Sequence, residues 1–192
     1  MTPSLLEAAL APGARWLATA DFDLAPLGEA DGPELFAHFA DPRVVAFMDI
    51  EPLADEDNAL AIIAWARAQR TAGHGVRLAI RATATGDFVG TCGFNSLTLE
   101  RGRRGEIAYD LGAAWWGRGV MGQILPRLVE IGFRALDLRR LEAMVTPGNH
   151  RSIRLLERHG FVREGLLRDH GFWRGRFQDQ LLYARLDLVA EG

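Results

Sequence analysis

The chain contains no lysine, and all 22 of its basic residues are arginine. This absence excludes two kinds of site. A Walker-type phosphate loop needs a lysine that reaches the phosphates, and Schiff-base catalysis needs a lysine amine. Any anion site in this protein must therefore be built without lysine.

Cysteine is almost as scarce, since Cys92 is the only one in 192 residues. A single cysteine cannot form an internal disulfide, which indicates a reducing compartment, and we expect a cytoplasmic protein. Cys92 lies in the stretch GTCGF with no evident histidine partner, so we expect a packed strand residue and not a nucleophile. The five histidines show no metal-ligand spacing, and no metal is expected.

Long apolar runs and an excess of positive charge are also missing. No apolar run approaches the length of a membrane span, and the N-terminus lacks the basic and apolar regions of a signal peptide. We therefore expect no membrane partner. Because the formal net charge is −3, we expect no direct nucleic-acid binding either. The length and the 48% hydrophobic composition predict one globular domain.

The sequence does contain a clear alternation of strand and helix signals. Strands are predicted at 15–27, 76–82, 87–97, 105–111 and 140–145, and helices at 32–40, 55–73, 118–136 and 149–160. A final hairpin is predicted around Arg174-Gly175. Asp55 is a candidate N-cap, and Gly73 and Gly160 are candidate helix stops. This order predicts an α+β fold with a mostly antiparallel sheet and one parallel crossover.

The stretch GRGVMG at 117–122 matches the dinucleotide-binding pattern G-x-G-x-x-G. Three features oppose a Rossmann site. Five residues separate the loop from the strand that ends at Leu111, and the acidic residue twenty positions on, Glu142, begins its strand instead of ending it. The chain then continues through a short helix into a hairpin, not into a parallel half-sheet.

An anion-binding loop is still expected at 117–122. A glycine-rich turn before a helix directs several N–H groups at one point, and Arg118 adds a full positive charge there. The alternative is a tight strand-to-helix turn in which Trp115 and Trp116 are core residues. The stretch alone does not decide between these two interpretations.

The order of several motifs resembles the GNAT superfamily of acetyl-CoA-dependent N-acetyltransferases. These motifs are EIAYDL (106–111), WGRGVM (116–121) and TPGNHRSIRLLERHGF (146–161). The segments RWLATADFDLAPL and EGLLRDHGFWRGRFQDQLLYARL are similar to the RimJ/RimL branch, which acetylates ribosomal-protein N-termini. The resemblance covers about residues 15–188. It implies a GNAT fold with about seven strands and about four helices, in a single domain over 1–192 with 1–14 as an N-terminal extension.

The resemblance also implies acetyl-CoA as the cofactor and a loop that binds its pyrophosphate through backbone N–H groups. The residues assigned to CoA on this basis are Leu111, Trp116, Gly117, Arg118, Gly119, Val120, Met121, Gly122, Asn149, Ser152 and Arg158. Gly119 matches the family pattern, whereas Trp116 and Met121 depart from it. Asn149 matches a CoA-contacting asparagine, although it is equally explained as a helix N-cap.

Arg151, Arg154 and Arg158 recur on one face of the helix that follows Asn149. One interpretation is that this basic face assists the CoA phosphates. The other, which the residues alone favour, is a solvated face that pairs with Glu157 and its neighbours.

Acetyl transfer from a thioester to an amine needs a base for the amine, a donor to the carbonyl oxygen and a proton source for the thiolate. Glu106 is the first candidate base, although a solvated edge-strand carboxylate explains it equally well. The N–H of Leu111 is the candidate donor. The tyrosine that many GNAT members use as the acid falls at Leu156, so that role cannot be transferred. The resemblance implies Ser152 in its place, while a local hydrogen bond at the third helical position is the alternative.

Asp110 is the second candidate base, and it alternates with Tyr109, so only one of the two faces the site.

The pKa of the acceptor amine also matters. An α-amine has a pKa of about 7.7–8.0 and a lysine side chain about 10.4, so deprotonating lysine at neutral pH costs roughly 3–4 kcal/mol more. A site without a tyrosine acid therefore suits an α-amine, such as a protein N-terminus, attacking directly in a ternary complex.

Other acceptors and functions stay open at this point. Phe47, Met48 and Trp65, with Phe94 nearby, are candidates for an acceptor groove. Core packing is favoured for Trp65, which lies in an apolar row with Ile62. The alternatives are a small-molecule amine as the acceptor, a non-catalytic acyl-CoA sensor and a dinucleotide-binding oxidoreductase. The resemblance is also compatible with a homodimer, which no sequence feature demonstrates.

Overall fold

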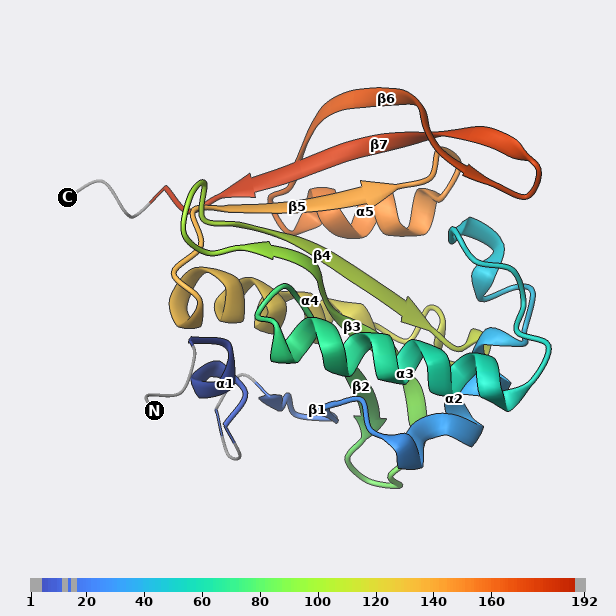
Figure 1. The fold of residues 1–192 in the computed structure, drawn as a ribbon. Helices are drawn as coiled ribbons and strands as arrows, with labels where there is room; N and C mark the ends of the chain where they lie inside the picture. Colours follow the sequence, from blue (N-terminus) through green and yellow to red (C-terminus); the bar gives the residue numbers. More distant parts are fainter. Residues whose placement is uncertain (1–4, 12–13, 15–16, 189–192) are drawn as a thin grey trace.

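The computed structural model of the chain describes residues 5–11, 14 and 17–188. Seven strands form one sheet in the order β1-β2-β3-β4-β5-β7-β6 (Figure 1). The strands are β1 (Phe22–Pro26), β2 (Val76–Ala82), β3 (Phe88–Thr98), β4 (Arg104–Leu111), β5 (Arg140–Val145), β6 (Val162–Trp173) and β7 (Arg176–Leu186). Neighbouring strands are antiparallel except β4 and β5, which are parallel. The predicted α+β architecture with a mixed, mostly antiparallel sheet is confirmed.

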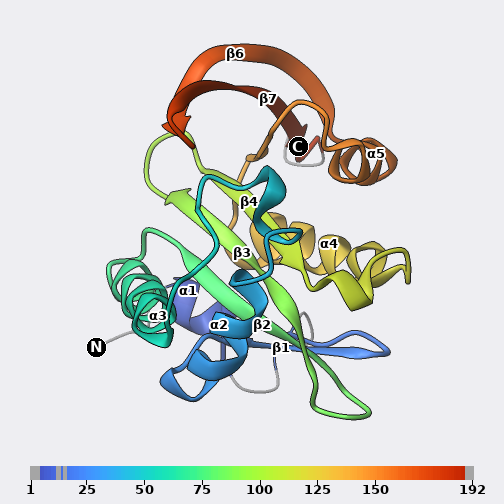
Figure 2. The same cartoon turned by 90° about the vertical axis from the view of Figure 1, so that its right-hand side faces the viewer.

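Helices cover both faces of this sheet (Figure 2). They are α1 (Leu5–Ala9), α2 (Gly32–Phe39), α3 (Glu56–Thr71), α4 (Val120–Glu130) and α5 (His150–Arg158). α2 and α3 close a smaller core that contains Leu35 and Ile63. α4 places Leu128 in a larger core, where α1 of the expected N-terminal extension buries Leu6 and Ala9. No helix in the described ranges is long and apolar enough to cross a membrane.

Several element ends follow the predicted signals. The Asp55 side chain caps α3 by accepting a hydrogen bond from the N–H of Asn58 at 2.9 Å. Gly160 follows α5 with a φ of +78°, the left-handed conformation of a glycine stop. The hairpin of β6 and β7 turns at Arg174-Gly175, whose φ values of +53° and +70° are those of a tight two-residue turn.

Two element boundaries differ from the prediction. The first strand begins at Phe22, because the Thr19 hydroxyl oxygen accepts the N–H of Phe22 at 3.0 Å and forms a turn before it; residues 15 and 16 lie outside the described residues. The helix predicted over 118–136 is α-helical to Glu130 and ends in a π-helical turn, Ile131–Ala135.

The buried face of α3 also differs from the prediction. The spacing of Ile62 and Trp65 predicts Trp65 in the core, but Trp65 is 48% exposed. The buried residues of α3 are Ala59, Ile63 and Ala66, which recur at helical spacing on the neighbouring face. The prediction was wrong because two residues of the packed face, Ala59 and Ala66, are small. The positions of the larger apolar side chains therefore do not identify that face.

β4 and β5 separate part-way along their length. Their parallel register holds for three pairs, of which Glu106 with Glu142 is the last, although β4 continues to Leu111 and β5 to Val145. The crossover helix α4 connects the two strands and lies beside them. The separated strand ends create an opening near the middle of the sheet.

Candidate active site

A cleft of about 1410 Å³ lies where β4 and β5 separate, and its floor is β4 from Glu106 to Leu111. One side, which we call the glycine half, is formed by residues between 111 and 122 and by α5 with its N-cap. The other side, which we call the hairpin half, is formed by residues 43–49 and 170–173. Since typical small-ligand pockets measure about 300–1,000 Å³, this cleft has room for a long ligand and a second molecule.

The glycine half contains an open helix N-terminus. Gly117 and Gly119 have φ values of +73° and +74°, a conformation that costs other residues roughly 1–2 kcal/mol, and Gly119 is the N-cap of α4. A Cβ built on Gly117, Gly119 or Gly122 meets no atom of the described residues within 4 Å. The glycines therefore leave the surroundings of the loop open. Gly122 donates its N–H to Gly119 O at 3.0 Å, whereas the N–H groups of Val120 and Met121 have no backbone partner in the described chain. Such a space suits a phosphate.

The two tryptophans before this loop organise its surroundings. The indole N–H of Trp116 donates to the Leu111 carbonyl at 2.8 Å, which ties the loop back to the end of β4. The guanidinium of Arg151 lies 4.5 Å from the centre of the Trp116 ring, and that of Arg118 lies 5.5 Å from the Trp115 ring. The tryptophans thus hold two arginines beside the glycine loop.

The row of Arg151, Arg154 and Arg158 lines the glycine half. Glu157, its expected partner, instead accepts the hydroxyl of Tyr183 at 3.1 Å. The described part of the chain places no carboxylate within salt-bridge distance of these three arginines. The row is therefore an uncompensated basic surface, of the kind that binds phosphate groups.

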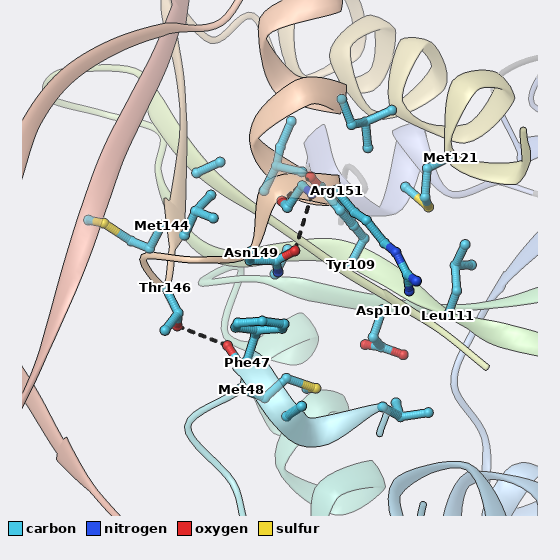
Figure 3. Close-up of a pocket in the computed structure, with 18 of the residues that line it drawn as sticks. Phe47, Met48, Tyr109, Asp110, Leu111, Met121, Met144, Thr146, Asn149 and Arg151 are labelled. Atoms are coloured by element: carbon cyan, nitrogen blue, oxygen red, sulfur yellow. Dashed lines mark hydrogen bonds between the residues drawn. The ribbon is translucent and has the colours of Figure 1, made fainter. Parts of the chain in front are cut away.

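Ser152 is positioned by a cap and a buried tyrosine. The Asn149 side chain caps α5 by accepting the N–H of Ser152 at 3.2 Å (Figure 3). The Ser152 hydroxyl lies 2.6 Å from the hydroxyl of Tyr109, which reaches the cleft from β4. Burial raises the pKa of Tyr109 to about 12, against the opposing effect of its hydrogen bond with Ser152. The phenol is therefore protonated at neutral pH.

The resemblance to the GNAT family implied no tyrosine in the site, because the family's usual tyrosine position falls at Leu156. Leu156 is 0% exposed and belongs to the core. The one available signal was the alternation of Tyr109 with Asp110, which requires one of them to face the site without saying which.

Asp110 belongs to the cleft floor, but its carboxylate is bound on all sides. Its carboxylate lies 2.6 Å from Nε2 of His38 and 3.1 Å from Nη2 of Arg77, and it accepts the N–H and the hydroxyl of Thr91 at 3.0 and 2.6 Å. Burial raises the pKa of Asp110, but the hydrogen bond with His38 and the charge of Arg77 outweigh burial, so the net pKa is lowered. A carboxylate held by this many hydrogen-bond and ion-pair partners is a poor proton acceptor.

Glu106 has the opposite environment, although it lies on the same strand. It lines the cleft at the point where β4 leaves β5. Burial raises the pKa of Glu106; the Asn95 side chain lowers it, while the carboxylates of Glu142 and Asp49 raise it further. A carboxylate with a raised pKa that faces a cleft is suited to accept a proton near neutral pH.

The backbone of Leu111 contributes at the end of the cleft floor. The N–H of Gly112 donates to the Val89 carbonyl of β3 at 2.9 Å. Because the backbone groups of an antiparallel strand alternate in direction, the N–H of Leu111 points away from β3, toward the opening beside β5. The Leu111 carbonyl already accepts the Trp116 indole, so the N–H is its available group.

Aromatic side chains mark the hairpin half. Phe47 is 44% exposed and lines it together with Met48, while Phe94 is 2% exposed and belongs to the core. Phe172 and Trp173 also line this half, a role that the sequence analysis did not assign to them. Figure 3 shows Phe47 and Met48 on one segment, with Leu111 and Met121 on the other side of the cleft.

A mostly antiparallel sheet that opens between two parallel strands, with a glycine loop at the crossover helix, differs from the parallel sheet of a dinucleotide-binding fold. A sequence profile of the family "Acetyltransferase (GNAT) domain" matches residues 22–162. The chain therefore belongs to the GNAT acetyltransferase family, and it is an acetyl-CoA-dependent N-acetyltransferase.

Individual relatives agree with this assignment. The chain is 38% identical over 156 residues to "Uncharacterized N-acetyltransferase p20" of Bacillus licheniformis, which covers 81% of this chain and 87% of that protein. It is 29% identical over 98 residues to the [Ribosomal protein uS5]-alanine N-acetyltransferase of Escherichia coli, or 51% of this chain and 50% of that protein. The solved structure of Mycobacterium smegmatis RimJ with CoA-disulfide has a TM-score of 0.80 at 23% identity, covering 89% of this chain and 84% of that one. This last similarity is one of fold.

Proposed function

We propose that the protein acetylates the α-amine of a peptide or protein N-terminus by direct attack on acetyl-CoA in a ternary complex. The observation that carries this proposal is that Glu106, Leu111 and Ser152 line one cleft, between an open phosphate-binding loop and an aromatic side. Acetyl-CoA supplies the activated acetyl group. The N–H groups of residues 117–122 and the basic row of α5 are the groups that would hold its phosphates.

Glu106 removes the proton from the acceptor amine. Its raised pKa lies closer to that of an α-amine than an ordinary carboxyl does, so less free energy separates the two proton acceptors. The N–H of Leu111 stabilises the negative charge that develops on the acetyl carbonyl oxygen, as oriented backbone donors do in other acyl transfers.

Ser152 and Tyr109 act together on the leaving sulfur. A phenol with a pKa of about 12 cannot pass its proton completely to a thiolate, because an ordinary thiol pKa of about 8.5 makes that transfer cost roughly 5 kcal/mol. The pair therefore stabilises the sulfur by hydrogen bonding. Tyr109 donates to the Ser152 oxygen, which directs the serine proton into the cleft.

The α-amine is favoured over a lysine side chain because its pKa of about 7.7–8.0 lies well below the lysine value of about 10.4, so Glu106 removes its proton at a lower cost in free energy. The E. coli relative named as a ribosomal-protein alanine N-acetyltransferase supports a ribosomal N-terminus as one such acceptor. A small-molecule amine is the alternative acceptor.

The test is a titration of the pure protein with acetyl-CoA and, in parallel, with NADH. Thiol release is then measured with peptides that begin with Ala, Ser or Met, with the same peptides N-terminally blocked, and with free lysine and spermidine. We expect binding of acetyl-CoA alone and turnover of unblocked peptides. Binding of acetyl-CoA without turnover of any amine would indicate a sensor, and turnover of spermidine alone would indicate the small-molecule alternative.

A further inference from the structure

The segment of residues 43–49, which we call the strap, is fastened across the mouth of the hairpin half. Its 3₁₀ turn, Val45–Phe47, offers successive backbone carbonyls. Arg174 donates from Nη2 to Val45 O at 2.7 Å and from Nη1 to Ala46 O at 3.0 Å. Both acceptors lie more than a hundred residues from Arg174 in the sequence. Figure 1 shows the strap region, in cyan, next to the tip of the β6–β7 hairpin.

A second fastening comes from the end of β5. The Thr146 hydroxyl donates to Phe47 O at 2.9 Å, as the dashed line in Figure 3 marks. Gln180 donates to the same hydroxyl oxygen at 3.2 Å and so orients its proton toward the strap. Three successive carbonyls of the strap are thus held by side chains from the C-terminal part of the chain.

We call the hydrogen bonds from Arg174 and Thr146 to the strap the clasp. The clasp closes one edge of the cleft. The strap and the end of β6 both line the hairpin half, and the clasp joins them directly. The strap and the hairpin therefore form one connected wall beside the route to Glu106. We call this route the passage.

The passage is apolar at its entrance. Phe47 and Phe172 are 44% and 63% exposed, and Phe172 is supported by edge-to-face contact with Phe177 at 5.1 Å between ring centres. Arg43 pairs with Asp41 and Arg77 with Asp110, while Asp49 and Glu106 line the passage with His170 nearby. The exposed aromatic rings at the entrance favour an acceptor that carries an apolar side chain.

We propose that the clasp makes Arg174 a positioning residue for the acceptor, which enters end-on as an extended peptide whose second residue is apolar. This inference rests on the proposed N-acetyltransferase function and specifies its acceptor. Phe47 and Phe172 flank the second residue, while the amine reaches Glu106. Bulky polycyclic amines, such as aminoglycosides, do not fit an end-on passage.

The test compares unblocked Ala-Phe and Ala-Asp hexapeptides, spermidine and an aminoglycoside as acceptors. For the wild-type protein we expect the Ala-Phe peptide to have the highest kcat/KM. Arg174→Gln removes two charge-assisted hydrogen bonds, so the KM of the Ala-Phe peptide rises roughly tenfold or more. The kcat of the variant with this peptide and its KM for acetyl-CoA stay within about twofold of the wild-type values, because Arg174 touches none of the reacting groups.

Two variants separate a positioning role from a general loss of structure. Arg174→Lys recovers part of the affinity, since an ammonium group reaches one carbonyl but lacks the guanidinium fork. Arg176→Gln changes an exposed arginine at the same turn and behaves as wild type. Hydrogen exchange at the Met48 amide, which donates to Val45 O within the strap at 2.9 Å, accelerates in Arg174→Gln. This last readout does not depend on turnover.

The possible failures are distinct. Wild-type protein that acetylates none of the four amines contradicts the proposed function and the acceptor with it. An active wild type without preference for Ala-Phe over Ala-Asp overturns the apolar passage. Unchanged Met48 exchange and an unchanged peptide KM in Arg174→Gln overturn the clasp, and so does an equal rise in the KM of peptide and acetyl-CoA.

Discussion

The two halves of the cleft are built in different ways. The glycine half is built largely from short stretches: Gly117 and Gly119 shape the start of α4, and Asn149 caps the helix that carries Ser152. The contact of Ser152 with Tyr109 is its long-range exception. The hairpin half joins residues about a hundred positions apart, as in the bond from Thr146 to Phe47. Local geometry can be recognised from a motif, whereas a long-range clasp depends on the finished fold.

β4, the strand between the two halves, carries two carboxylates with different environments. Glu106 and Asp110 are both carboxylates on β4, and both were candidate bases. Glu106 faces the cleft with a raised pKa, while Asp110 is enclosed by His38, Arg77 and Thr91 with a lowered pKa. One carboxylate is placed for proton transfer and the other for structure. Substitutions at these two positions should therefore have opposite consequences.

The largest effect is expected for Glu106→Gln. Loss of a general base should lower kcat with a peptide acceptor about 10²–10⁴-fold, while the Kd for acetyl-CoA is unchanged. Steady-state thiol release and calorimetric titration measure the two quantities. Glu164→Gln is the matched control, because Glu164 is an exposed carboxylate outside the cleft that pairs with Arg140, and its removal should leave kcat within about threefold. A normal kcat in Glu106→Gln would remove Glu106 as the base.

Asp110→Asn should instead destabilise the fold. Removing one partner of a buried charge network costs about 3–5 kcal/mol in the free energy of unfolding, measured by urea denaturation at pH 7. Because the folded pKa of Asp110 is lowered, its stabilisation is present above the ordinary carboxyl value and is lost as the pH falls through the folded pKa. The difference from wild type should therefore shrink in acid. A stable Asp110→Asn variant with a specific loss of kcat would reverse the contrast with Glu106.

Ser152→Ala and Tyr109→Phe test the pair in the glycine half. We expect Ser152→Ala to lower kcat roughly 10–100-fold and Tyr109→Phe to lower it less, as for loss of one or two hydrogen bonds to the leaving group. Because the two hydroxyls act as one unit, the double variant should be little worse than Ser152→Ala. Fully multiplicative losses would show that the two groups act independently.

The smallest effect concerns the stability cost of Glu106 itself. A carboxyl with a raised folded pKa stabilises the fold below its unfolded pKa, and that contribution is lost as the pH rises through the folded pKa. Glu106→Gln, which mimics the protonated form, should therefore have a higher Tm than wild type at pH 8 and the same Tm at pH 4. Thermal unfolding at the two pH values measures the difference, and a lower Tm at pH 8 would contradict the pKa direction.

The sequence predicted the fold well because its signals are local. Caps such as Asp55, the glycine stop at Gly160 and the Arg174-Gly175 turn each depend on a few adjacent residues. The failures have a different origin. Trp65 was assigned to the core because short alanines, which form the real buried face of α3, carry a weak hydrophobic signal.

The site was predictable in the same uneven way. Glu106, Leu111 and Ser152 follow from motif order, and all three line one cleft. Tyr109 was missed as a partner of Ser152, since their contact spans 43 residues and joins a strand to a helix. The structural role of Asp110 likewise depends on its contacts with His38 and Arg77, which only the folded chain brings together.

The division of the cleft can be measured directly by NMR on protein labelled with ¹⁵N-glycine, since glycines lie in both halves. Coenzyme A is titrated into the protein, and the amide shifts of Gly117, Gly119 and Gly122 are followed beside those of Gly171 and Gly175. We predict large, saturable shifts for the three loop glycines and none for the two hairpin glycines. Shifts confined to Gly171 and Gly175, with the loop glycines unmoved, would contradict the assignment of the glycine half to acetyl-CoA.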